Sequence, residues 1–330
     1  MKKSATLLLI FALVILVIPA AVVLPFSQKQ AAQETAAHLA LFQTRKSSPP
    51  SVTVSVHRSL SGKTEQVDLN QYLIGVVGSE MPASFQPQAL EAQALAARTY
   101  IMSRIINNPG QSVTDTVSSQ VYHSPQELKR IWGKDYTWKM AKIEKAVAVT
   151  DNQVITYHGK LISPVFFSTS NGYTENAKDY WTTDVPYLKS VPSPWDKLSP
   201  KYKMEKKISA SDAATALGTT LPGNDGELGT VVKKTSTGHI AQYRISGKLF
   251  TGREIREKLN LSSTDFTLIR SGGTIIAGTL GDGHDVGMSQ YGAQGMAREG
   301  KTAEQIVTYF YQGTQVSKMT LSPGKSVAKK

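Results

Sequence analysis

One glutamate, Glu80, stands between apolar residues in the stretch VVGSEMP, directly ahead of a long helical segment. Val76, Val77 and Met81 surround it in the sequence. Apolar surroundings disfavour the charged carboxylate and raise its pKa, as a general acid for glycosidic cleavage requires. From these residues alone, Glu80 is either such an acid or a carboxylate that caps a turn or pairs with Arg98.

Arg98 belongs to a segment with the pattern of a helix that begins at Pro87. Proline suits the first turn of a helix, where its missing N–H has no partner to lose. Apolar residues then recur at helical spacing, at Leu90, Ala94, Ala97, Ile101 and Ile105. Arg98 lies at the edge of this stripe, where a guanidinium normally has a fixed partner. It is either a functional group near Glu80 or a structural, snorkelling side chain.

Residues 168–181, STSNGYTENAKDYW, concentrate groups that suit a sugar ligand. Hydroxyls and an amide come from Ser168, Ser170, Asn171 and Thr174. Tyr180 and Trp181 either stack on sugar rings or pack in the core.

A glycine-rich stretch follows much later in the chain, GTLGDGHDVGMSQYGAQGMAREG. His284 could bind a metal with Asp282 or Asp285, although such a histidine more often orients a loop by hydrogen bonding. A helix is expected to begin near Gly287. Thr302 and Gln305 then form a capping box for a last helix that ends at Gly313.

The composition narrows the chemistry. The 330 residues include no cysteine, which excludes disulfides, thiolate metal sites and a thiol nucleophile. The net charge of +12 favours a polyanionic partner, such as nucleic acid, anionic lipid or an acidic wall polymer.

The N-terminus indicates export. Lys2 and Lys3 precede an apolar run from Leu7 to Phe26, which is long enough to cross a bilayer. Basic residues on the short flank place that end in the cytoplasm. We expect an uncleaved signal anchor over residues 1–26, with a cleaved signal peptide as the alternative. Residues 27–330 then lie outside the cytoplasm, which disfavours nucleic acid as a partner.

The rest of the chain predicts a mixed α+β fold with two lobes and a central substrate cleft. Residues 27–50 form a linker that ends in KSSPP. Residues 51–207 form the main catalytic body, beginning with an alternating strand over 51–57. Residues 208–268 form a smaller lobe, residues 269–316 return to complete the body, and residues 317–330 form a flexible tail.

Several motifs together resemble the stage II sporulation protein D family. YLIGVVGSEMPASFQPQALEAQALAARTYIM is similar to its first signature, and GHDVGMSQYGAQGMA is similar to its second. SSQVY, AVAVTDNQVITYHGKLISPVFFSTSNGYTENAKDYW and VPYLKSVPSPWD stand between them in the family's order. The resemblance covers about residues 51 to 316, and ordered motifs are far more specific than a single one.

The resemblance implies a lytic transglycosylase of peptidoglycan glycan strands, preferably strands stripped of stem peptides. It implies Glu80 as the catalytic acid and Arg98 as the family's helix arginine. Hydrolytic glycosidases need two carboxylates. Here the 6-hydroxyl of muramic acid attacks its own anomeric carbon to leave a 1,6-anhydro end, so one glutamate can serve as acid and then as base.

The resemblance also implies the remaining site residues and partners. Tyr187 and Lys189 match a segment associated with the cleft, or else lie on a solvated strand edge. The expected substrate-binding set is Arg98, Ser168, Ser170, Asn171, Thr174, Tyr187, Lys189, His284, Ser289, Gln290 and Tyr291. The implied context is septal thinning and engulfment at the membrane of a sporulating cell, with the amidase stage II sporulation protein P and the membrane protein stage II sporulation protein M.

No cofactor is expected. Some relatives bind zinc through cysteine and histidine near SSQVY, but this chain has Ser118 and Ser119 there. The family usually has glycine at Asp285, which puts the local turn in question. Two other classes remain open. One is a non-catalytic wall-binding amidase activator; the other is a hydrolase, whose second carboxylate would be Glu91, Asp179 or Asp184.

Overall fold

The computed structural model describes residues 52–319. The predicted anchor over residues 1–26 and the linker over 27–50 lie outside this range. Within residues 52–319, no helix is long and apolar enough to cross a membrane.

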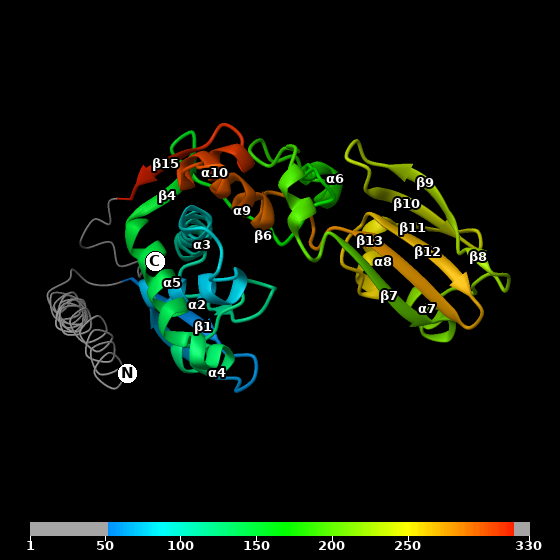
Figure 1. Cartoon of the computed structure of the whole chain (residues 1–330), viewed down its shortest axis with the longest axis horizontal. Coiled ribbons are helices and arrows are strands. Elements are labelled where there is room, and N and C mark those ends of the chain that lie inside the picture. The colour runs from blue at the N-terminus through cyan, green and yellow to red at the C-terminus, as the bar shows by residue number, and fades with distance from the viewer. Residues whose placement is uncertain (1–51, 320–330) are drawn as a thin grey trace, which may run out of the picture. The chain divides into compact units, whose positions relative to one another are not determined.

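Helix α3, Pro87–Asn107, is the central element of the main hydrophobic core (Figure 1). Its alanines are small enough to let neighbouring elements approach from several sides, and Ala89, Ala92, Ala94 and Ala96 are fully buried. Helices α2, α5, α9 and α10 and strand β4 all pack against it. The predicted start at Pro87 is confirmed.

Helix α2, Leu69–Glu80, leads directly to the candidate acid. The Asp68 side chain caps it by accepting hydrogen bonds from the backbone N–H groups of Asn70 and Gln71. The helix ends at Glu80, and Met81 is already extended ahead of a proline. Residues 72–77 are a short apolar run that suits a strand and a helix equally, and in the structure they are helical.

Short strands and further helices complete the body. The strand predicted over residues 51–57 is confirmed as β1 over Thr53–His57, and residue 51 lies outside the described residues. The sheets have the orders β2-β1-β3 and β15-β4-β5, with β6 and β14 as a parallel pair. The strands are β1 Thr53–His57, β2 Thr64–Asp68, β3 Val113–Thr114, β4 Gln153–Tyr157, β5 Lys160–Leu161, β6 Phe166–Phe167, β14 Met288–Ser289 and β15 Gln315–Lys318. The other helices are α4 Pro125–Trp132, α5 Tyr136–Val149, α6 Ala177–Trp181, α9 Gln290–Arg298 and α10 Ala303–Phe310, with 3-10 turns η2 Gly133–Asp135 and η3 Pro194–Leu198.

Two predicted helix starts can be compared with the structure. The capping box of Thr302 and Gln305 is present at α10, as predicted. The preceding helix, α9, begins at Gln290 rather than near Gly287, because Ser289 caps it and Met288 and Ser289 still pair with β6.

A second hydrophobic cluster, separate from the main core, is built by residues of the 203–280 segment. Its sheets have the orders β7-β13-β12-β8 and β11-β10-β9. The elements are β7 Lys203–Ser209, α7 Ala210–Leu217, β8 Gly226–Glu227, β9 Thr230–Lys234, β10 Ile240–Ile245, β11 Lys248–Thr251, α8 Gly252–Leu259, β12 Phe266–Ser271 and β13 Thr274–Leu280. The mixed α+β class is confirmed. Because β7 pairs with β13 over its whole length, the sheet extends past both predicted lobe boundaries, 208 and 268.

Candidate active site

Glu80 is half-buried at the C-terminal end of α2. Its Oε1 atom accepts a hydrogen bond from the backbone N–H of Val121, at 2.7 Å. Burial raises the pKa of the Glu80 carboxyl, and the Val121 hydrogen bond opposes this by favouring the carboxylate. The pKa stays above its ordinary value. The carboxyl therefore keeps its proton to a higher pH than an exposed glutamate, and the Val121 N–H can stabilise it once the proton is lost.

The two signature segments meet at the loop that follows Glu80. Gln290 Nε2 donates to the backbone carbonyl of Glu80 at 3.0 Å, across 210 positions of sequence. Gln294 Oε1 accepts from the backbone N–H of Gln86 at 2.7 Å. One amide thus holds each end of the loop between α2 and α3, and Tyr291 packs edge-on against Phe85 in the same loop.

A third segment, residues 120–124, packs along α2. Tyr122 stacks on Tyr72, with ring centroids 5.4 Å apart. A Cβ at Gly75 would lie 2.4 Å from the Tyr122 ring, so only glycine permits this approach. His123 Nδ1 lies 2.8 Å from Ser79 Oγ, next to Glu80. Sequence reasoning missed Val121, His123 and Ser79 as site residues, because the SSQVY segment was considered only for zinc and lacks the cysteine that zinc would need.

Arg98 lies away from Glu80. Its guanidinium donates to Asn70 Oδ1 at 3.1 Å and to the carbonyl of Val147 at 3.0 Å, with Asp151 at 3.6 Å. Asn70 is ten positions before Glu80 on α2, which is about 15 Å along the helix axis. The side chain is 1% exposed. We therefore interpret Arg98 as a structural residue joining α2, α3 and α5, and not as a partner of Glu80.

Ser170 and Ser289 share a buried partner that the sequence did not reveal. The Ser170 N–H donates to Asp196 Oδ2 at 2.9 Å, and its hydroxyl donates to the same oxygen. Ser289 Oγ donates to Asp196 Oδ1 at 2.6 Å and also caps α9 through the N–H of Gly292. All three side chains are fully buried. This buried network fixes the start of α9 and thereby the position of Gln290.

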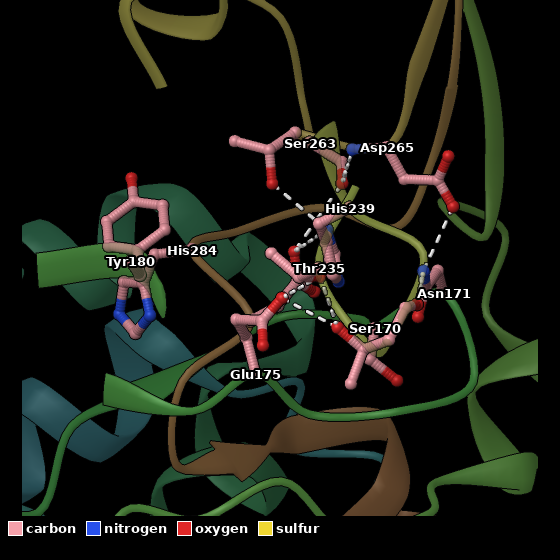
Figure 2. Close-up of polar contacts among 12 residues, drawn as sticks. Ser170, Asn171, Glu175, Tyr180, Thr235, His239, Ser263, Asp265 and His284 are labelled. Atoms are coloured by element: carbon pink, nitrogen blue, oxygen red, sulfur yellow. Dashed lines mark hydrogen bonds and ion pairs between the residues drawn. The ribbon is translucent and has the colours of Figure 1, made fainter. Parts of the chain in front are cut away.

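Asn171 forms hydrogen bonds with two residues of the 203–280 segment. Its Nδ2 atom donates to Asp265 Oδ2 at 2.9 Å and to the carbonyl of Thr237 at 3.0 Å (Figure 2). Nearby, the buried Glu175 accepts from Thr235 Oγ1 at 2.7 Å. These partners give Asn171 a positioning role within the protein.

The other predicted ligand residues of residues 168–191 also have protein partners. Thr174 is fully buried, and its Oγ1 accepts from the N–H of Val191 at 2.8 Å. The Ser168 carbonyl accepts from the N–H of Tyr291 at 3.1 Å. Tyr187 OH accepts from the N–H of Ser163 at 3.0 Å.

Lys189 differs from these residues because its side chain is 42% exposed. It pairs with Asp184, which is more exposed still. Surface ion pairs of this kind contribute little and exchange readily with other anions. Lys189 therefore stays available as a group that binds a ligand.

His284 orients its own loop. Its Nδ1 atom accepts from the N–H of Val286 at 3.1 Å, and its ring lies 5.3 Å from that of Trp181. Burial lowers the pKa of His284 to about 4, so the ring is neutral. Asp282 is paired with Lys201 instead. Within residues 52–319, no cluster of histidine and acidic side chains is arranged for a metal.

Asp285 keeps the turn geometry that glycine would allow. Its φ of +62° lies in the left-handed region, which aspartate tolerates better than most residues. The side chain is fully buried, and Ser263 Oγ lies 3.5 Å from its Oδ2 atom. Burial raises the pKa of Asp285 well above its ordinary value. The departure from glycine thus leaves the turn intact and buries an acid beside it.

Comparisons with known proteins agree with these motifs. A family model described as "Stage II sporulation protein" matches residues 58–157. The chain is 46% identical over 347 aligned positions to stage II sporulation protein D of Bacillus subtilis (strain 168), and 45% identical to that of Bacillus amyloliquefaciens; both alignments cover 100% of each chain. A protein named amidase enhancer, from Bacillus subtilis (strain 168), is 28% identical over 74% of this chain and 40% of its own length. On the full-length identity to the first two, the chain belongs to the stage II sporulation protein D family.

Proposed function

We propose that this protein is a lytic transglycosylase that cleaves the glycan strands of peptidoglycan. The observation that carries the proposal is the half-buried Glu80, whose pKa is raised by burial and whose carboxylate form has a backbone donor. A group that must first give a proton and then take one needs both features.

The step needs no water and no second carboxylate. Protonated Glu80 donates to the glycosidic oxygen as the bond from that oxygen to the muramic acid anomeric carbon breaks. The 6-hydroxyl of the same sugar forms the new bond to that carbon, and its proton passes to the Glu80 carboxylate. The glutamate ends protonated, as it began. The Val121 N–H stabilises the carboxylate between the two transfers.

Two of the three residues considered for a second carboxylate have other partners. Asp179 Oδ2 accepts from Asn176 at 2.9 Å, and Asp184 pairs with Lys189. Glu91 lies on α3, and its pKa is raised by burial and lowered by the charge of Lys145. A hydrolase would need one of them opposite Glu80 with a water between. A lytic transglycosylase needs none of them, because Glu80 alone can act as acid and then as base.

The wider proposal places the enzyme in sporulation. An anchor over residues 1–26 would hold the body outside the cytoplasm at the septal membrane. The reaction would thin septal peptidoglycan during engulfment. The expected partners are stage II sporulation protein P, whose amidase action would strip the strands first, and stage II sporulation protein M in the membrane.

A second function, non-catalytic activation of an amidase, is suggested by the relative named amidase enhancer. One experiment separates the functions: purified protein is incubated with peptidoglycan strands with and without stem peptides, and the products are identified by mass spectrometry. The transglycosylase gives 1,6-anhydro ends and a hydrolase gives reducing ends. An activator gives no product alone but accelerates the added amidase.

A further inference from the structure

His123 is held beside the candidate acid by a bond whose direction can be assigned. Ser79 Oγ lies 2.6 Å from the carbonyl oxygen of Gly75, an acceptor only, so the single hydroxyl proton points there. Ser79 Oγ must then accept from the histidine, 2.8 Å away. The proton of a neutral His123 therefore sits on Nδ1.

The backbone around His123 carries the donor that Glu80 uses. Val121 lies two residues earlier, and its N–H reaches Glu80 Oε1 at 2.7 Å. Between them, Tyr122 stacks on Tyr72. The segment thus touches α2 at successive points, and its last contact is His123 on the residue next to Glu80.

We propose that His123 is a positioning residue for the reaction at Glu80, holding residues 120–124 on Ser79 so that the Val121 N–H stays on the carboxylate. This inference rests on the proposed function of Glu80. In this role the segment acts through the His123–Ser79 hydrogen bond and the Val121 backbone N–H, without a metal. It also explains why a half-buried acid has a backbone donor in place instead of a charged neighbour.

The proposal has a signature that a purely structural contact would lack. Burial and the Val121 hydrogen bond are the two causes acting on the pKa of Glu80, in opposite directions. Tyr72 is the titratable neighbour on the same helix, and its own pKa is far above the working range. Releasing the Val121 N–H removes the lowering cause. With Glu80 still buried, the alkaline limb of the pH–activity profile, where Glu80 loses its proton, then moves to higher pH.

The test compares kcat and KM as functions of pH for four variants of the full-length protein on peptidoglycan strands. His123→Ala is expected to lower kcat between about tenfold and a hundredfold, because small displacements of catalytic groups have effects of this size. Its alkaline limb moves up in pH and its KM changes little. Ser79→Ala removes the same bond from the other side and moves the limb in the same direction.

Two further variants are the controls. His123→Asn is expected to restore most activity and the original limb, because its side-chain nitrogen is attached at the same position as Nδ1. His158→Asn replaces an exposed histidine at a left-handed position, which asparagine tolerates, and leaves both quantities unchanged.

The outcomes are distinct from those that test the function itself. If Glu80→Gln is inactive while His123→Ala and Ser79→Ala keep the wild-type limb, the positioning role is overturned and the proposed function stands. If Glu80→Gln cleaves as the wild type does, the proposed function fails. Should His123→Ala not fold, Ser79→Ala and His123→Asn decide the question through the same pH profiles.

Discussion

Gln290 donates its side-chain N–H to the backbone carbonyl of Glu80 at 3.0 Å. The sequence placed Gln290 in the glycan-binding set, but its side chain is 7% exposed and serves the acid's own backbone. The second family signature therefore holds the backbone of the first in place by a hydrogen bond. Together with Gln294 on Gln86, it fixes the loop on which the position of Glu80 depends.

Gln290→Ala should lower both stability and activity. It leaves the Glu80 carbonyl without its donor, which costs about 1 to 3 kcal/mol when the group stays buried. Urea unfolding followed by circular dichroism gives the first effect, and glycan cleavage gives the second. Gln111→Ala, at an exposed position, is the control. Wild-type stability and wild-type cleavage in Gln290→Ala would mean that the loop keeps its conformation without this hydrogen bond.

Glu80→Gln should abolish cleavage while the fold and glycan binding remain. The amide matches the carboxyl in shape but cannot give and recover a proton, and such groups contribute at least about a hundredfold to the rate. Release of anhydro-sugars is measured by mass spectrometry, and binding by sedimentation with insoluble peptidoglycan. Anhydro-sugar release at the wild-type rate would remove Glu80 from the chemistry.

Arg98→Ala should mainly affect stability, in contrast to the binding role that the sequence suggested. The substitution removes a buried side chain and the partners of Asn70 and Val147, with a cost of about 2 to 4 kcal/mol. Arg98→Lys should recover only part, because an ammonium lacks the planar fork. Arg104→Ala, exposed on the same helix, serves as control. A raised KM at unchanged stability would return Arg98 to the binding site.

Asp285→Asn should stabilise the protein increasingly as pH rises. A carboxyl whose folded-state pKa is raised contributes stability that is complete below its unfolded pKa and is lost as pH increases toward the folded pKa. The asparagine side chain does not titrate, and asparagine tolerates the φ of +62°. Thermal unfolding from pH 3 upward should thus show curves that coincide at low pH and then separate. A constant difference at every pH would mean that folding does not shift the pKa of Asp285.

Removal of metal should leave activity and folding unchanged. The zinc ligands of some relatives include cysteine, which this chain lacks, and a tight zinc site takes three or four protein ligands. The protein is dialysed against EDTA, and glycan cleavage and thermal unfolding are then measured. A loss that zinc restores would identify a site of oxygen and histidine ligands, to be sought first at His123 and then at His284.

Local patterns made parts of this structure predictable. Pro87 and the alanine spacing predicted α3, and the box of Thr302 and Gln305 predicted α10, because these signals act within a few residues. Residues 72–77 stayed ambiguous, since a short apolar run suits a strand and a helix equally.

The site was less predictable because its contacts are remote in sequence. Glu80 could be identified from its residue type and its apolar neighbours. Its donor is the backbone N–H of Val121, and a backbone group has no signature in the sequence. Asp196, which holds Ser170 and Ser289, gave no signal either. Arg98 was at the edge of an apolar stripe, and only the structure shows that its partners are Asn70 at the start of α2 and Val147 of α5.

The bond between Gln290 and Glu80 also sets an order of events during biosynthesis. The acid is made early and its clamp late, 210 positions further along the chain. Ribosomal synthesis proceeds from the N-terminus, so the loop at residues 81–86 has neither glutamine until residues 290–294 have been made. A chain truncated before residue 290 carries Glu80 without the glutamines that position its loop. Under the proposed function, completion of the polypeptide would itself be a safeguard against premature cutting of the wall.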